Sequence, residues 1–244
     1  AVRARTIAYS TERVKPSELS TYAALGAARW KGKLCLRTGK AVYNQSLVAM
    51  MIGDMGEEAT DKLVSDWIAN LATEPFSNDT LLLKAIAAGQ CDIGIVNTYY
   101  LGRLQHEQKG FPVQIFWADQ DGAGTHVNIS GGGVTKHAKN RAEAVRFLEW
   151  LASPAIQERF AAVNFEFPAN ASVDPLPVTA TSAPMVPAHS VRNTATTHAR
   201  RRQRNTACAG VGVASSMTAA PRVVAVLACA PPIVNACGNT RPPT

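Results

Sequence analysis

Two adjacent tyrosines, Tyr99 and Tyr100, follow an apolar run in the stretch "CDIGIVNTYYLGRL". Successive side chains of a β-strand point to opposite faces, so a strand that continued through this pair would send only one phenol away from the core. Two explanations are open at this point. The pair is either ordinary aromatic packing at a strand edge, or it brings two hydroxyl groups to one place in a loop.

Phenolate oxygen would be the reactive group of such a pair. A free phenol has a pKa near about 10, so a tyrosine that ionises near neutral pH needs a strong Lewis acid beside it. Ferric iron is the biological cation that fits, because Ca²⁺ and Mg²⁺ prefer carboxylate and carbonyl oxygens. We expect His106 on the surface and His126 and His137 in or beside a turn, none of them as a metal ligand.

Polar side chains also gather in two other segments that lead into expected helices, "RTGKAVYNQS" (37–46) and "SNDT" (77–80). In α/β proteins, ligands bind beyond the carboxyl ends of strands, beside helix N-termini whose free N–H groups attract anions. Together with "VNTYY" (96–100), these segments form three junctions that we expect to meet at one edge of a sheet.

A small anion such as carbonate or phosphate could be held at that edge by backbone N–H groups of residues 39–43. The side chains that could assist are Arg37, Asn44, Gln45, Asn78 and Asn97. Spacing alone favours a plainer explanation, in which Asn78 only caps a helix, Arg37 pairs with a surface carboxylate and Gly39 serves a turn.

The periodicity of apolar residues predicts strands alternating with helices, hence an α/β domain with a largely parallel sheet. The expected strands lie in 5–11, 33–38, 91–96, 113–122 and 122–134. The expected helices lie in 20–34, 39–56, 57–72, 77–90 and, broken at Pro154, 140–162.

The chain has 244 residues, 46% of them hydrophobic, and a net charge of +7 that belongs entirely to its C-terminal part. Residues 1–175 carry 18 basic and 18 acidic side chains, whereas residues 176–244 carry seven arginines and no acid. This tail has no aromatic residue, so we expect it to be disordered and foreign to the fold. Three explanations of the tail are open: a basic segment that touches RNA or membrane, a natural linker, or a reading frame translated out of register. We expect no nucleic-acid partner.

Two cysteines, Cys35 and Cys91, lie in the globular part, each near the start of an apolar, strand-like run. Two buried thiols would explain them. A disulfide between neighbouring strands would explain them equally well if the protein is exported. The sequence starts at Ala1, and its first residues have neither the basic nor the apolar region of a signal peptide.

The blocks "VYNQSL", "AAGQCDIGIVNTYYLGRL" and "GTHVNISGGGVTKHAKNRAEAVRFLEWLASPAIQ" resemble the periplasmic ferric-iron-binding proteins of bacterial ABC importers. The resemblance runs through residues 1 to roughly 175. It implies an α/β, type II periplasmic-binding-protein fold, mostly one lobe plus part of the second. It also implies a monomeric, non-enzymatic protein that binds Fe³⁺ with a synergistic anion and delivers it to a permease in the inner membrane.

The family's tyrosine ligands map onto Tyr99, Tyr100 and Tyr43. Anion contacts or supporting roles in relatives map onto one group of residues: Arg37, Gly39, Lys40, Ala41, Asn78 and Asn97. Relatives usually have small or hydroxyl residues where this chain has Gly39 and Lys40, so the anion loop departs from the family pattern.

The resemblance also divides the chain into three parts. Residues 1–129 would form the ligand-binding lobe, 130–175 a segment that returns to the other lobe, and 176–244 the tail. The family's first lobe and its ligands have no counterpart here, so we expect this chain alone to bind iron weakly or not at all. The alternatives are a truncated, inactive fragment, or a binding protein for a polyamine, a sulfonate or a phosphorylated compound.

Overall fold

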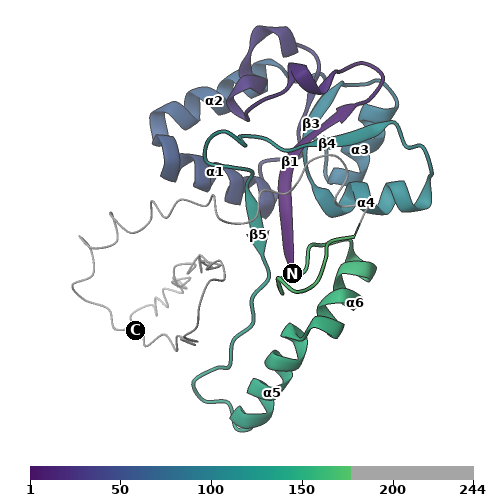
Figure 1. The fold of residues 1–244 in the computed structure, drawn as a ribbon. Coiled ribbons are helices and arrows are strands. Elements are labelled where there is room, and N and C mark those ends of the chain that lie inside the picture. Colours follow the sequence, from purple (N-terminus) through teal and green to yellow (C-terminus); the bar gives the residue numbers. More distant parts are fainter. Residues whose placement is uncertain (177–244) are drawn as a thin grey trace, which may run out of the picture.

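Strand β1 (Val2–Ser10) lies in the middle of the sheet and organises the fold (Figure 1). The computed structural model describes residues 1–176. The other strands are β2 (Leu34–Cys35), β3 (Ile93–Asn97), β4 (Val113–Phe116) and β5 (Val127–Ile129). The sheet order is β2-β3-β1-β4, and β5 pairs with the first residues of β1.

The prediction of a largely parallel sheet is wrong. Within residues 1–176, β2 and β3 form the one parallel pair of strands, whereas β1 is antiparallel to β3, β4 and β5. Alternation of strands and helices predicts parallel pairing for strands that are joined through helices, and β2 and β3 are joined through three of them. The connections from β1 to its neighbours also contain β2 and are longer, so the alternation does not fix the direction of β1.

Helices cover both faces of the sheet. On one face, Ile7 and Ile95 pack against α1 (Val42–Met55) and α2 (Glu57–Ala69). On the other face, Ala8 and Val96 pack against α3 (Asp79–Ala87) and α4 (Thr98–Glu107). Burial of two such apolar layers is the main source of stability for this arrangement.

The helix expected in 20–34 is instead a pair of short 3₁₀ turns, Ala23–Gly26 and Ala28–Trp30. A further 3₁₀ turn spans Pro16–Glu18. The Asn70 side chain donates hydrogen bonds to the carbonyls of Leu25 and Ala27, each at 2.9 Å. The Ala27 carbonyl also accepts the Trp30 backbone N–H at 3.0 Å, so the Asn70 side chain, at the end of α2, fixes the place where one turn stops and the next begins.

The last described elements, α5 (Arg141–Ala152) and α6 (Pro154–Asn164), form a pair that extends away from the sheet (Figure 1). Two extended segments connect this pair to the sheet: β5 before it, and a segment after it that pairs with β1 through Val2 and Phe167. Among residues 1–176, no helix is long and apolar enough to cross a membrane. The tail that we expect to be disordered, residues 176–244, lies outside the described residues except for Leu176.

Candidate functional site

The adjacent tyrosines lie in the first turn of α4, which begins directly where β3 ends. Their ring centroids are 4.3 Å apart, with ring planes tilted by 31°. Tyr99 is buried and Tyr100 is half-buried. The sequence left open whether the pair lies at a strand edge or in a loop. In the structure it lies in neither, because the first turn of a helix brings both rings to the same end of the sheet.

Tyr43 joins this pair from a different element, the first turn of α1. Burial raises the pKa of Tyr99 above its ordinary value, and interactions with the side chains of Tyr100 and Tyr43 raise this pKa further. The Asn97 side chain acts in the opposite direction. Three phenols from two helices thus meet around Tyr99, which stays protonated without a cation to stabilise its ionised form.

Arg5 is fully buried and makes hydrogen bonds with side chains of all three predicted junctions. Its Nη1 donates to Asp79 Oδ2 at 3.0 Å and to Asn97 Oδ1 at 3.3 Å, and its Nη2 donates to the Ile95 carbonyl at 3.1 Å. Its Nε and Nη2 donate to Asn44 Oδ1 at 2.9 and 2.5 Å. The Asn97 backbone N–H also donates to Asp79 Oδ2, at 2.9 Å. These contacts bring the three predicted junctions together, because Asn44, Asp79 and Asn97 each belong to one of them.

Arg37 lies at the outer side of this network. Its Nη1 is 3.7 Å from Asp79 Oδ1, and its guanidinium lies 5.5 Å from the centre of the Tyr43 ring. Arg37 Nη1, Asp79 Oδ1 and Asn97 Nδ2 are buried and have no hydrogen-bond partner among the described residues. Unpaired buried polar atoms are costly, so this side of the phenol cluster has hydrogen-bonding capacity for a further group.

The other residues that were predicted to contact an anion are Asn78, Gly39, Lys40 and Ala41. Asn78 accepts the Leu81 backbone N–H at 2.9 Å through its side chain, which is the capping role of the plainer explanation. Gly39 and Lys40 are exposed, and Ala41 is the N-cap residue of α1. The exposed Arg103 places its guanidinium 5.2 Å from the centre of the Tyr99 ring.

Of the three histidines considered, His106 and His137 are exposed. His126 is half-buried, and its Nε2 lies 3.2 Å from Ser46 Oγ, which donates to Asn128 Oδ1 at 2.9 Å. Burial, together with the charge of Arg5, lowers the pKa of His126 to about 4. Within residues 1–176, no three His, Cys, Asp or Glu side chains are grouped so that they could hold a metal ion.

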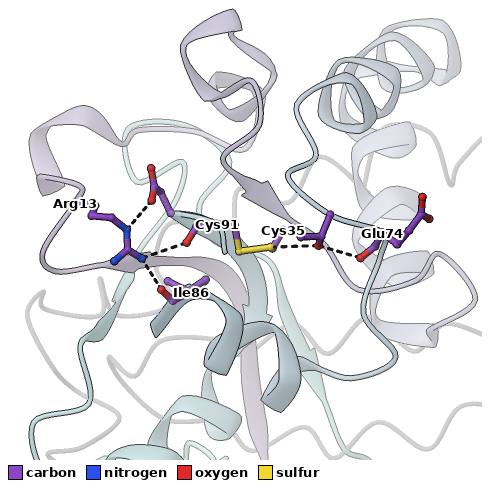
Figure 2. Close-up of a disulfide and its surroundings, with 7 residues drawn as sticks. Arg13, Cys35, Glu74, Ile86 and Cys91 are labelled. Atoms are coloured by element: carbon purple, nitrogen blue, oxygen red, sulfur yellow. Dashed lines mark hydrogen bonds and ion pairs between the residues drawn. A yellow bond between two sulfur atoms is a disulfide. The ribbon is translucent and has the colours of Figure 1, made fainter. Parts of the chain in front are cut away.

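A disulfide joins Cys35 to Cys91 and crosslinks β2 to the start of β3 (Figure 2). Arg13 lies on one side of it and donates to Asp92 Oδ1 at 2.7 Å and to the carbonyls of Ile86 and Cys91. This bond is at the opposite end of β3 from Tyr99, so it stabilises the sheet without entering the phenol cluster.

Sequence reasoning missed Arg5 and Asp79 as parts of the site. An arginine inside the apolar strand 5–11 was the available signal, since a buried guanidinium must find a carboxylate or several carbonyl acceptors. The partner could not be identified in this way, because Asp79 follows the capping residue Asn78 and resembles any other acidic residue in the first turn of a helix.

The chain is similar to several known proteins. The family model described as bacterial extracellular solute-binding protein matches residues 2–188. Iron uptake protein A1 of Synechocystis is 44% identical over 177 residues, which cover 70% of this chain and 49% of that protein. The major ferric iron-binding protein of Neisseria meningitidis is 26% identical, over 78% of this chain and 58% of that protein. The chain thus spans about half the length of these curated relatives.

Two solved structures share the fold. A Trichodesmium protein (IdiA, FutA) in complex with iron and citrate has a TM-score of 0.70 and 44% identity, over 73% of this chain and 58% of its own. A Bordetella ferric binding protein has a TM-score of 0.70 and 36% identity, over 75% of this chain and 60% of its own. The type II periplasmic-binding-protein fold that the motifs predicted is confirmed. The chain belongs to the family of bacterial extracellular solute-binding proteins.

Proposed function

We propose that this chain is the iron-binding part of an extracytoplasmic solute-binding protein that carries Fe³⁺ to an ABC importer. The observation that carries the proposal is the meeting of Tyr43, Tyr99 and Tyr100 at one point, although Tyr43 lies on α1 and the pair on α4. Iron-related relatives that are 44% identical over this part of the chain support it.

The chemistry follows from the protonation of the phenols. Because burial raises the pKa of Tyr99, the free protein holds a neutral phenol there. Fe³⁺ replaces the phenol protons and binds the oxygens as phenolates, so that binding releases protons to solvent. A cation of lower charge would gain less from phenolate oxygen, which favours ferric iron among biological metals.

The three phenols leave coordination positions of Fe³⁺ free. A synergistic anion, carbonate or phosphate, would fill some of them from the side of Arg37, whose Nη1 has no hydrogen-bond partner among the described residues. Asn97 and the N-terminal turn of α1, with Gly39, Lys40 and Ala41, would assist. Asn78 would contribute through the N-terminus of α3 that it caps.

A protein of this kind works outside the cytoplasm, in the periplasm, and passes its iron to a membrane permease. Names of relatives such as "Fe(3+)-binding periplasmic protein" from Serratia marcescens, 25% identical, support that location. We propose that the whole binding protein, with both lobes present, is a monomer that acts by binding and release, without catalysis. Residues 1–129 would form the iron-binding lobe, and 130–175 the segment that belongs to the second lobe.

The test is a titration of the full chain with ferric nitrilotriacetate in bicarbonate buffer, followed by visible absorption. Phenolate-to-iron charge transfer should give a coloured complex that is lost in Tyr99→Phe and weakened in Tyr43→Phe and Tyr100→Phe. Of the two outcomes expected from the sequence, weak binding or none, the proposal requires weak binding, because three phenols meet in this chain but occupy only part of the coordination sphere.

Tyr9→Phe is the matched control, since Tyr9 is buried in the core on β1, away from the three phenols. The control should keep the colour of the unmodified chain. No colour at saturating iron, or a colour that survives in all three site variants, would refute the proposal.

A further inference from the structure

The two helices that carry the phenols are held in position by one side chain of β1. Arg5 reaches Asn44, the neighbour of Tyr43 on α1, and Asn97, the residue before α4. It also reaches Asp79, the first residue of α3. A single buried guanidinium therefore contacts the start of each of the three helices that surround the site.

We propose that Arg5 is the positioning residue of the phenol cluster. Its guanidinium fixes the start of α1 relative to the start of α4, so that Tyr43 meets Tyr99 and Tyr100. The inference rests on the proposed function in that the cluster it organises is the iron site, but the positioning itself can be measured without iron.

The hydrogen-bond pattern shows why this position requires arginine. Asn44 Oδ1 accepts from Arg5, while Asn44 Nδ2 donates to the carbonyls of Arg37 and Thr38 at 2.6 and 3.2 Å. The amide thus connects Arg5 to the loop that precedes α1. A planar guanidinium has five donors in a fixed fork and can serve Asn44, Asp79 and the Ile95 carbonyl together, whereas an ammonium group has three donors on one atom.

Asp79 completes the network. Its Oδ2 accepts from both Arg5 Nη1 and the Asn97 backbone N–H, so the carboxylate fixes the end of β3, two residues before Tyr99. Both side chains of this ion pair are fully buried. Removal of one partner alone would leave an uncompensated buried charge and would destabilise the whole domain, which would hide a positioning effect.

The test therefore uses two variants of the full chain. Arg5→Met/Asp79→Asn removes both charges and keeps an acceptor for the Asn97 N–H. Asn44→Ala leaves the ion pair in place and removes only the link to α1. Arg13→Met/Asp92→Asn is the matched control, because that ion pair lies at the other end of β3, with a 2.7 Å contact. Circular dichroism and thermal melting establish which variants are folded.

The first measurement is ¹⁹F NMR of the iron-free protein labelled with 3-fluorotyrosine. The chain has five tyrosines, and their signals can be assigned with Tyr→Phe variants. In Arg5→Met/Asp79→Asn, the signals of Tyr43, Tyr99 and Tyr100 should shift and broaden while that of Tyr9 stays in place. In Asn44→Ala, the Tyr43 signal should move most. If the double variant does not fold, the ¹⁹F spectrum of Asn44→Ala alone tests the inference.

The second measurement is the titration with ferric nitrilotriacetate. Loss of a residue that orients metal ligands typically weakens metal binding about 10- to 100-fold, and we expect this loss with less charge-transfer intensity per bound iron. The Arg13 control should bind as the unmodified chain does. Phenol signals and an iron affinity that are unchanged in folded Arg5 and Asn44 variants would overturn the inference. Absence of colour in the unmodified chain would instead refute the proposed function, and the NMR comparison would still decide the role of Arg5.

Discussion

At the scale of single residues, the site combines one phenol that resists ionisation, that of Tyr99, with a buried ion pair, Arg5–Asp79. Burial raises the pKa of Tyr99, and the nearest fully buried carboxylate, Asp79, is held by Arg5. At the proposed site, a divalent cation would therefore meet a neutral Tyr99 and a carboxylate that is already paired with an arginine, whereas Fe³⁺ would have the charge needed to displace phenol protons. Competition between protons and Fe³⁺ makes such a site bind more tightly at neutral than at acidic pH.

His126 makes the fold less stable at acidic pH than at neutral pH. Burial and the neighbouring Arg5 lower its pKa to about 4, whereas an unfolded chain has a histidine pKa near about 6.5. Between these values the unfolded state binds the extra proton, so the stabilisation is complete above about pH 6.5 and is lost as the pH falls toward 4.

We expect the free energy of unfolding to fall by up to about 3 kcal/mol from this residue between pH 7 and pH 4. Urea unfolding at several pH values would measure it. His126→Gln should flatten the pH dependence in that range, and His137→Gln, at an exposed position, should leave it as in the unmodified chain. Equal pH dependence in all three proteins would contradict this account.

The residues of the site differ in how far sequence alone could identify them. Tyr99 and Tyr100 could be singled out from the sequence as a phenol pair at the end of a strand, whereas Tyr43 was assigned only through the family resemblance. Arg5 and Asp79 were not identified, because their roles depend on a contact between residues that lie far apart in the chain. Asn97 was predicted as an anion contact, and in the structure its amide also serves the internal network.

At the scale of elements, helices α1, α2 and α3 begin close to where apolar periodicity and capping residues predicted them, whereas α4 was expected only as the helix that follows the junction 96–100. Asn78 caps α3, and Gly56, with a φ of 88°, separates α1 from α2. Such signals are local, so a sequence displays them directly. The direction of β1 and the 3₁₀ turns before Trp30 depend on partners elsewhere in the chain, and these were predicted wrongly.

The disulfide is an element-scale constraint with a measurable contribution. It closes a loop between residues 56 positions apart, which by chain entropy stabilises the fold by about 3–4 kcal/mol. We expect Cys35→Ala/Cys91→Ala to lose stability of this size in guanidinium unfolding.

The same variant should keep the ¹⁹F signals of the phenol cluster, because the bond lies at the other end of β3. Perturbed phenol signals in a folded variant would show that the disulfide also shapes the site, contrary to this expectation.

At the scale of the whole molecule, the pair α5–α6 leaves several large apolar side chains exposed. Phe147 is 56% and Trp150 52% exposed, and their rings stack with centroids 5.7 Å apart. Phe160 and Val163 add to the exposed apolar surface of α6. A cluster of this kind favours association.

We therefore expect the isolated chain to self-associate as its concentration rises. Phe147→Ser/Trp150→Ser should reduce this association in sedimentation velocity experiments, because it removes the stacked aromatic pair. Ile68→Ser is the control, since Ile68 is equally exposed, at 59%, but lies on α2. A double variant that associates as strongly as the unmodified chain would exclude this surface as the cause.

The central position of β1 has a consequence for the order of folding. All its strand partners, β3, β4 and β5, come later in the chain, and Arg5 reaches its opposite residue, Asn97, only after the three intervening helices have been synthesised. Pairings between such distant residues form slowly, because a long loop must close first. Among the strands of residues 1–176, β1 is thus synthesised before all its partners and is among the last to be paired, and until then a chaperone or a translocation channel would meet an extended, unpaired segment.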